Sequence, residues 1–161
     1  MEKLLIPKKK LGLLAGMLVG GMVVTMPVQA SSILDELPGT ETTEDFAEDT
    51  STILTRGNYL NLGHMKISKL ASNKINIYGL TQCHRVCDRA YLYIYLEQKV
   101  DGSYGTYKSW KFEDTEVSNL DKSINVIVPS GHYYRVRGYH AAKEGTTKES
   151  TETLTDGVLV K

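Results

Sequence analysis

Residues 89–99 read RAYLYIYLEQK, and the pattern of this stretch decides the fold class. Leu92, Ile94 and Leu96 are apolar, and a tyrosine precedes each of them. Because successive side chains of a β-strand point to opposite faces, this period of two predicts a strand with a buried aliphatic face and an outer face of tyrosines. The dipeptide at 101–102, Asp-Gly, is typical of a hairpin turn, so the chain should return along residues 104–112.

The same period of two recurs on both sides of this hairpin, and no window of the chain shows the spacing of an amphipathic helix. The expected extended segments, separated by turn residues, are 64–70, 74–82, 89–99, 104–112, 123–129, 132–142 and 148–161. Short strands repeated at intervals of about 8–12 residues are typical of a β-sandwich. We therefore predict an all-β sandwich domain of seven strands over residues 56–161.

The first thirty residues have the features of a secretory signal peptide. Four lysines lie within residues 1–10, residues 11–26 carry no charge, and Ala30 supplies the small residue of a cleavage site. A membrane anchor is the alternative, but sixteen uncharged residues that include four glycines are few for a membrane span. We predict removal of residues 1–30 and a secreted chain that lies outside the cell or on its envelope, without stable membrane insertion.

Charge divides the remaining chain into two parts. Residues 31–55, the acidic arm, contain seven acidic side chains, no basic one and few large apolar groups. Such a stretch buries too little apolar surface to order itself, so we expect a flexible linker or pro-segment. Residues 56–161 carry fifteen Lys or Arg against eleven Asp or Glu, a net charge of +4. The opposite signs leave a second hypothesis open, in which the acidic arm docks on the basic domain.

Residues 123–155, SINVIVPSGHYYRVRGYHAAKEGTTKESTETLT, resemble the last three strands of a fibronectin type III or related immunoglobulin-like domain. In such domains an apolar strand, a Pro-Gly turn and a Tyr-x-Val-x strand precede a glycine loop and a polar closing strand. The resemblance implies a seven-stranded immunoglobulin-like β-sandwich. It also implies that Tyr134 occupies the position of a tyrosine corner, whose hydroxyl bonds to nearby backbone.

Three further segments carry a second resemblance. CDRAYLYIYLEQK (87–99), YKSWKF (107–112) and YYRVRGYHAAKEG (133–145) are similar to small secreted domains of unknown function from Gram-positive, clostridia-like bacteria. This resemblance covers nearly all of residues 56–161. It implies an exported domain and brings no catalytic residues, because that family has none assigned.

Motifs of catalysis and cofactor binding are absent from the sequence. None of the four histidines lies in an HExxH motif or near a GxSxG motif, and no glycine-rich phosphate loop occurs. We therefore expect no enzyme, no cofactor and no metal. Scattered carboxylates leave a small hydrolase as the alternative, although a sandwich of residues 56–161 offers little room for a glycosidase cleft.

Cys83 and Cys87 are the two cysteines, in a C-x3-C spacing with His84 between them. Four residues of extended strand would separate their Cα atoms by about 13 Å, whereas a disulfide needs about 4.4–6.8 Å. A bridge therefore requires the chain to turn between them, which would also mark a strand boundary. Export favours a disulfide. Two free thiols are the alternative, and a zinc site lacks the second ligand pair of its usual pattern.

The segment 132–142 alternates as residues 89–99 do, and in an immunoglobulin-like sandwich the two are neighbours in one sheet. Their outward side chains are the candidate ligand-binding residues: Tyr91, Tyr93, Tyr95, Tyr133, Arg135, Arg137 and Tyr139. Tyr104 and Tyr107 could extend this face. Tyr and Arg are enriched at binding hot spots. Two other interpretations stay open: the tyrosines stabilise the sheet through cross-strand pairs, or the acidic arm covers them.

These observations predict a secreted, non-catalytic binding module for a protein or cell-envelope partner. Flat tyrosine rings also stack on sugars, so a carbohydrate-binding domain for cell-wall or host glycans is one alternative. A structural envelope or matrix protein that associates through its edge strands is another. Nucleic acid is not an expected partner, because the domain is exported and its net charge is only +4.

Overall fold

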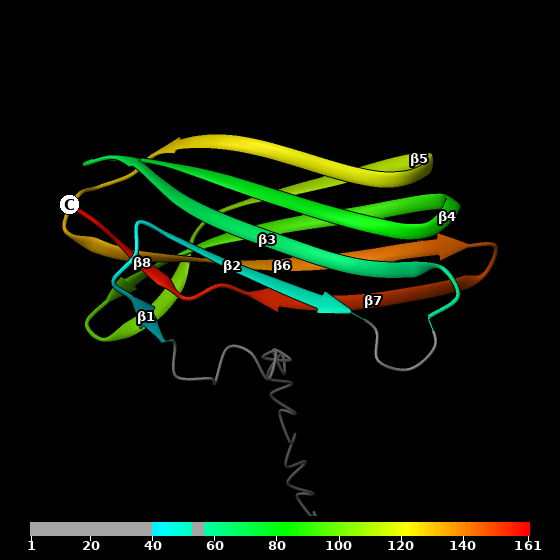
Figure 1. The fold of residues 1–161 in the computed structure, drawn as a ribbon, viewed down its shortest axis with the longest axis horizontal. Coiled ribbons are helices and arrows are strands. Elements are labelled where there is room, and N and C mark those ends of the chain that lie inside the picture. The colour runs from blue at the N-terminus through cyan, green and yellow to red at the C-terminus, as the bar shows by residue number, and fades with distance from the viewer. Residues whose placement is uncertain (1–39, 53–56) are drawn as a thin grey trace, which may run out of the picture. The chain divides into compact units, whose positions relative to one another are not determined.

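A computed structural model of the chain describes residues 40–52 and 57–161. The expected signal peptide, residues 1–30, and residues 31–39 and 53–55 of the acidic arm lie outside the described residues. The described part is all-β, as predicted, and its eight strands are β1 (Glu41–Thr42), β2 (Phe46–Thr52), β3 (Leu60–Ala71), β4 (Lys74–Val100), β5 (Ser103–Ile127), β6 (His132–Glu144), β7 (Thr147–Leu154) and β8 (Gly157–Val160) (Figure 1). Within these residues there is no helix long and apolar enough to cross a membrane.

Two very long strands dominate the fold. β4 spans 27 residues and β5 spans 25, and they pair as an antiparallel hairpin along their length. The turn predicted at Asp101 and Gly102 is confirmed, and both residues adopt a positive φ, of 51° and 84°, as a tight hairpin turn requires. Each long strand joins two segments that the sequence predicts as separate, namely 74–82 with 89–99 in β4 and 104–112 with 123–129 in β5.

The hairpin folds back on itself where β4 contains extra residues. Gln82 pairs with Asn119 and Cys87 pairs with Val117, so that the four residues of β4 between these pairs face one residue of β5. Such a bulge bends the strand and increases its twist. Glu116, beside the bulge on β5, adopts a positive φ of 55°. Both strands therefore turn back at one end of the molecule while their pairing continues (Figure 1).

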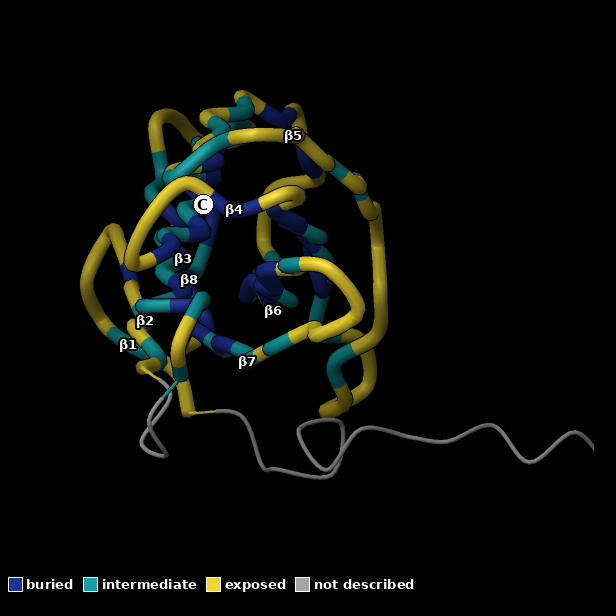
Figure 2. Tube along the Cα trace, turned by 90° about the vertical axis from the view of Figure 1, so that its right-hand side faces the viewer, coloured by how far each residue is buried: buried dark blue, intermediate teal, exposed yellow. Residues whose placement is uncertain are grey.

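The fold-back places two halves of one sheet against each other. The first half of β4 pairs with β3, and β3 with β2. The second half pairs with β6, which carries β7 and β8, and β1 extends β8. The result is one nearly closed, barrel-like sheet (Figure 1, Figure 2). The expected seven-stranded immunoglobulin-like order is not what the structure shows, because β4 and β5 pass from one layer to the other and the acidic arm adds β1 and β2.

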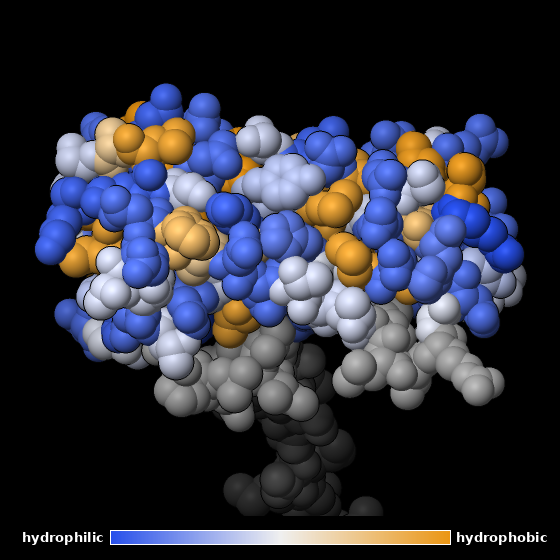
Figure 3. Space-filling view, in the orientation of Figure 1, coloured by the Kyte–Doolittle hydropathy of each residue, from blue (hydrophilic) through white to orange (hydrophobic). Residues whose placement is uncertain are grey.

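The core lies between the two layers. The fully buried apolar side chains include Met65, Ile67, Ile75 and Ile77 from one layer and Leu92, Ile94, Leu96 and Val136 from the other. The aliphatic face predicted for residues 89–99 is therefore confirmed. Inward residues of β4 are odd-numbered before the bend and even-numbered after it. A regular strand keeps the same parity along its length. The extra residues of the bulge change which positions of β4 face inward. On the side seen in Figure 3, hydrophobic residues form small separate patches among hydrophilic ones.

Tyr134 ties the turn between β5 and β6 to the core. Its hydroxyl donates to the carbonyl oxygen of Pro129 at 2.9 Å and accepts from the side-chain amide of Gln98 at 3.0 Å. A bond from this hydroxyl to nearby backbone is what the resemblance to immunoglobulin-like domains implies. The bond is thus present although the strand order differs.

Most of the described part of the acidic arm, residues 40–52, lies in strands. β2 pairs antiparallel with β3, and β1 pairs parallel with β8. Its acids reach groups of the domain: Asp45 contacts Lys69 at 2.8 Å, Glu48 contacts Lys66 at 3.4 Å, and Asp49 accepts from the backbone N–H of Leu154 at 2.8 Å. A flexible linker therefore does not describe residues 40–52, because pairing with distant strands compensates for their poor apolar content.

A histidine lies at the centre of the core. His140 is fully buried, with its Nδ1 3.0 Å from Thr81 Oγ1 and its Nε2 2.9 Å from Thr153 Oγ1. Because Thr81 donates its own proton to the carbonyl of Tyr91, Nδ1 of the imidazole carries the proton and Nε2 accepts one from Thr153. A Cβ at Gly63 would collide with the imidazole ring, so this close approach needs a glycine.

The buried imidazole makes stability depend on pH. Burial lowers the pKa of His140 to about 4, from 6.5 in the exposed state. The stabilisation from a neutral imidazole is therefore complete above pH 6.5 and is lost as the pH falls toward 4. We expect the free energy of unfolding to drop by about 2 kcal/mol between pH 6.5 and about pH 5, measured by urea unfolding at each pH.

His140→Gln should lower stability at neutral pH, where the imidazole is neutral, and remove most of this pH dependence. His84→Gln, at an exposed histidine, is the matched control and should keep it. An unchanged pH dependence in His140→Gln would contradict the assignment.

Candidate functional site

Four neighbouring strands present one outer surface, which we call the tyrosine face. Across the second half of β4 the strands lie in the order β5, β4, β6 and β7. Tyr93 of β4 pairs with Lys111 of β5 on one side and with Tyr139 of β6 on the other. The tyrosine face consists of Tyr91, Tyr93, Tyr95, Lys111, Arg137, Tyr139 and Lys148.

A cation lies over the tyrosine rings of this face. The distances from the cationic atom to the ring centroid are 4.0 Å for Lys148 and Tyr91, 5.5 Å for Lys148 and Tyr139, 5.2 Å for Lys111 and Tyr93, and 4.5 Å for Arg137 and Tyr95. At such distances the negative face of an aromatic ring attracts a cation. The rings are therefore covered by cations of the same chain, and these cations are the groups that a partner would meet first.

The tyrosine rings of this face also contact one another. The centroids of Tyr93 and Tyr139 lie 5.4 Å apart with an interplanar angle of 30°, and Tyr91 meets Tyr93 edge-on at 6.2 Å. Aromatic pairs in these arrangements contribute about 0.5–1.5 kcal/mol beyond their buried area. The Tyr93 hydroxyl donates to Glu113 at 2.8 Å, and this bond raises the pKa of Tyr93 to about 12. The Tyr93 hydroxyl therefore stays protonated. The Tyr93 ring is held between Tyr91 and Tyr139.

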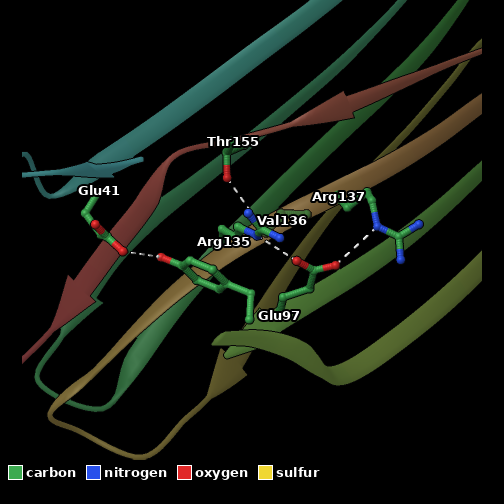
Figure 4. A network of polar contacts seen from close by, with 7 residues as sticks. Glu41, Glu97, Arg135, Val136, Arg137 and Thr155 are labelled. Carbon is green, nitrogen blue, oxygen red and sulfur yellow. Dashed lines mark hydrogen bonds and ion pairs between the residues drawn. The ribbon is translucent and has the colours of Figure 1, made fainter. Parts of the chain in front are cut away.

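At one end of the face two arginines share a buried carboxylate (Figure 4). Glu97 accepts from Nε of Arg135 at 2.7 Å and from Nε of Arg137 at 3.2 Å. Tyr104, from the start of β5, lies over Arg135 with 4.1 Å between its ring centroid and the guanidinium carbon. The Tyr104 hydroxyl donates to Glu41 of β1 at 3.4 Å. A contact from the acidic arm thus reaches this end of the face.

The structure corrects the expectation that all seven predicted residues face solvent. The seven residues do lie on the same side of β4 and β6. Tyr93 pairs with Tyr139 and Tyr95 pairs with Arg137, and the other three lie two residues from one of these or from each other along the same strand. However, Arg135 is only 3% exposed and Tyr91 only 8%. Tyr104 covers Arg135, and Lys148 covers Tyr91. Tyr133 lies apart from the tyrosine face, in a pocket that it shares with the acidic arm.

Some residues of the face were not predicted from the sequence. A regular hairpin closed at residues 101–102 would pair Tyr93 with Trp110. A register shift beside Glu97 instead brings Lys111 opposite Tyr93. No local signal shows such a shift, so Lys111 could not be found. Glu97, in contrast, continues the alternation of the three outward tyrosines of β4, and that pattern could have included it.

Tyr104 and Tyr107 take different positions from those expected. Tyr104 covers Arg135 at the end of the face. Tyr107 lies in the stretch where the register shifts, and its ring meets the core residue Tyr134 edge-on at 6.1 Å. Tyr107, which is 37% exposed, therefore contacts a core residue from the surface and does not extend the tyrosine face.

Cys83 and Cys87 lie at the fold-back of β4. Both are buried, their Sγ atoms are 2.7 Å apart, and the thiols are free. The chain irregularity that a bridge requires is present between them, and the disulfide expected after export stays a prediction. Burial raises the pKa of Cys83 to about 12, so its thiol is protonated. Among residues 40–52 and 57–161, no group of three or more His, Cys, Asp or Glu is placed to hold a metal ion.

The fold and this face define an all-β domain with a cation-covered aromatic surface. Residues 37–158 match the pattern of a family of unknown function, DUF6147, and the chain belongs to that family. The match includes β1 and β2, so the family pattern begins within the acidic arm. A comparison with curated proteins finds no match.

The shared carboxylate of Glu97 should matter more to stability than an exposed ion pair does. Glu97→Gln leaves two guanidinium groups beside a neutral amide, one of them almost fully buried. Removing one partner of a buried ion pair costs about 3–5 kcal/mol. We expect urea denaturation to show a fall in the free energy of unfolding of about 3 kcal/mol or more.

Glu113→Gln is the matched control. The side chain of Glu113 is 41% exposed and pairs with Arg89 at 3.4 Å, and exposed pairs contribute about 0–1 kcal/mol. Glu113 also accepts from the Tyr93 hydroxyl, and the side-chain oxygen of glutamine can accept that bond as well. Equal losses of stability in the two variants would contradict the role assigned to Glu97.

Proposed function

We propose that the protein is a secreted, non-catalytic binding module whose tyrosine face takes acidic groups of a protein or cell-envelope partner. The observation that supports this most strongly is the set of Lys111, Arg137 and Lys148 held over tyrosine rings on one surface. Export is part of the proposal and rests on the sequence of residues 1–30.

The lysines that lie over tyrosine rings are already positioned to bind an anion. Lys111 and Lys148 are exposed, yet each has an aromatic ring beneath it that limits its positions. Binding to side chains already in place loses less conformational entropy than binding to free ones. Carboxylate or phosphate groups on the partner would form charge-assisted hydrogen bonds with these cations. The tyrosines would then supply apolar contact area beneath the ion pairs.

A carbohydrate-binding domain is the rival function, and the row of tyrosines favours it. Stacking of a sugar needs an open ring face, so Lys148 would first have to leave Tyr91 and Tyr139. Moving Lys148 off these rings loses the cation–π attraction, which is about 0.5–1 kcal/mol at an exposed site. Salt distinguishes the two functions, because dissolved ions screen charge contacts and leave stacking largely unchanged.

Co-sedimentation of the purified protein with insoluble cell-wall material tests the proposal. We expect the wild type to sediment at low ionic strength and to be released as salt rises, since the screening length shrinks from about 30 Å at 0.01 M to about 3 Å at 1 M. Lys148→Gln should weaken binding about fivefold, equivalent to about 1 kcal/mol.

Lys66→Gln is the matched control, because Lys66 also lies over an aromatic ring, Phe46 at 4.7 Å, but on β3 in the other layer. This variant should bind as the wild type does. Salt-independent binding that Tyr93→Ala abolishes and Lys148→Gln leaves intact would establish sugar stacking instead. If the wild type does not sediment at any salt concentration, an insoluble wall ligand is rejected.

A further inference from the structure

The outer edge of β5 is the longest strand edge without a partner in the described part of the chain. β5 pairs with β4, and no strand among the described residues lies on its other side. Along such an edge every second residue leaves its backbone N–H and C=O free to pair with another strand. The edges of β2 and β7 approach each other instead, with the hydroxyl oxygens of Ser51 and Thr151 2.6 Å apart. β5 is also largely exposed (Figure 2).

The charges of this edge are arranged symmetrically with opposite sign. In the stretch KSWKFEDTE, centred on Phe112, lysines precede the centre by one and four residues and glutamates follow it by one and four. An antiparallel second copy, related by a two-fold axis through Phe112, would place Lys111 opposite its Glu113. The same axis places Lys108 opposite its Glu116, which lies at the end of this stretch, where β5 bends and Glu116 adopts a positive φ. Opposite charges that face each other across strands stabilise the pairing.

Shifting the axis by one residue destroys this match. Residues that face each other in an antiparallel pair lie on the same side of the sheet, so a two-fold axis perpendicular to the sheet passes through a residue. An axis through Lys111 or Glu113 would set two like charges directly opposite each other, which is destabilising. Lysines on an edge usually prevent strand pairing, but here glutamates at the symmetric positions compensate for them.

The residue on the axis also favours contact between copies. Phe112 is half-buried at the margin of the core, beside Trp110. Both residues pair with inward residues of β4, Leu92 and Ile94. Contact between Phe112 and its symmetry-related copy would remove from water the part of the ring that Lys122, 5.6 Å from the ring centroid, leaves exposed, which is favourable.

We propose that two copies of the chain associate by antiparallel pairing of their β5 strands over residues 108–116, with the two-fold axis at Phe112. The pairing joins the two sheets into one. Because the axis is perpendicular to the sheet, the tyrosine faces of the two copies lie on the same side. Their joint use rests on the proposed function and relies on Arg137 and Lys148, because Lys111 faces Glu113 of the second copy in the dimer; it would increase avidity for a repetitive surface. The dimer itself does not depend on that function.

The mass of the purified protein, measured by sedimentation velocity over two decades of concentration, tests this dimer. The wild type should shift toward twice the monomer mass as concentration rises. Lys108→Glu sets glutamates opposite each other at two symmetric sites and should weaken self-association about tenfold. Adding Glu116→Lys restores opposite charges in reversed order and should return the dissociation constant to within about threefold of the wild-type value. Restoration also shows that glutamate at position 108 is compatible with the fold.

Hydrogen exchange gives a second measurement of the interface. Backbone amides within 108–116 should exchange more slowly at high protein concentration, whereas amides within 119–127, beyond the bend of the same strand, should not change. A chain that stays monomeric overturns the proposal, as does a dimer that Lys108→Glu does not weaken or that Glu116→Lys does not restore. A wild type that forms the dimer but does not sediment with wall material would count against the proposed function alone.

Discussion

The continuous backbone pairing of β4 with β5 is the constraint on which the rest of the structure depends. A bulge on one strand and a residue of positive φ on the other let the hairpin fold back without losing its ladder. The core forms because this fold-back sets two aliphatic faces against each other. The bulge holds an odd number of extra residues, so the outward side of β4 changes from even to odd positions. Without that change, Tyr91, Tyr93 and Tyr95 would point into the core.

The tyrosine face follows from the same arrangement. Its side chains come from four strands, and each ring lies under a cation from another position of the sheet. The rings lose exposure to water while the cations stay near it, which stabilises a surface that would otherwise be strongly apolar. At the end of the face near Glu97 the charged groups are buried. Glu97 accepts hydrogen bonds from Arg135 and Arg137, and Tyr104 covers Arg135. The surface therefore combines an aromatic layer with charge, and the proposed binding function rests on this combination.

Local patterns predicted extended structure, the hairpin turn and the alternating sides of residues 89–99 correctly. They predicted separate strands where β4 and β5 are continuous, and one strand over 148–161 where β7 and β8 are two. They failed where pairing depends on distant segments. Composition predicted a flexible arm, but residues 40–52 add β1 and β2 to strands far along the chain. A register shift of one residue near Glu97, which no turn signal encodes, brings Lys111 opposite Tyr93. The resemblance to immunoglobulin-like domains implied the Tyr134 bond and also a strand order that the structure does not show.

The sequence by itself determined the secondary structure class and the composition of each strand face, because alternation and turn chemistry are local properties of the chain. Only the tertiary structure decided which faces meet, which tyrosines are covered and by which cations. These outcomes depend on the number of residues in two irregularities, at the fold-back and near Glu97. One residue more or less at either place would exchange the inward and outward faces of a whole strand segment. The alternating sequence pattern is the same whichever face points inward, so it cannot show which of the two forms.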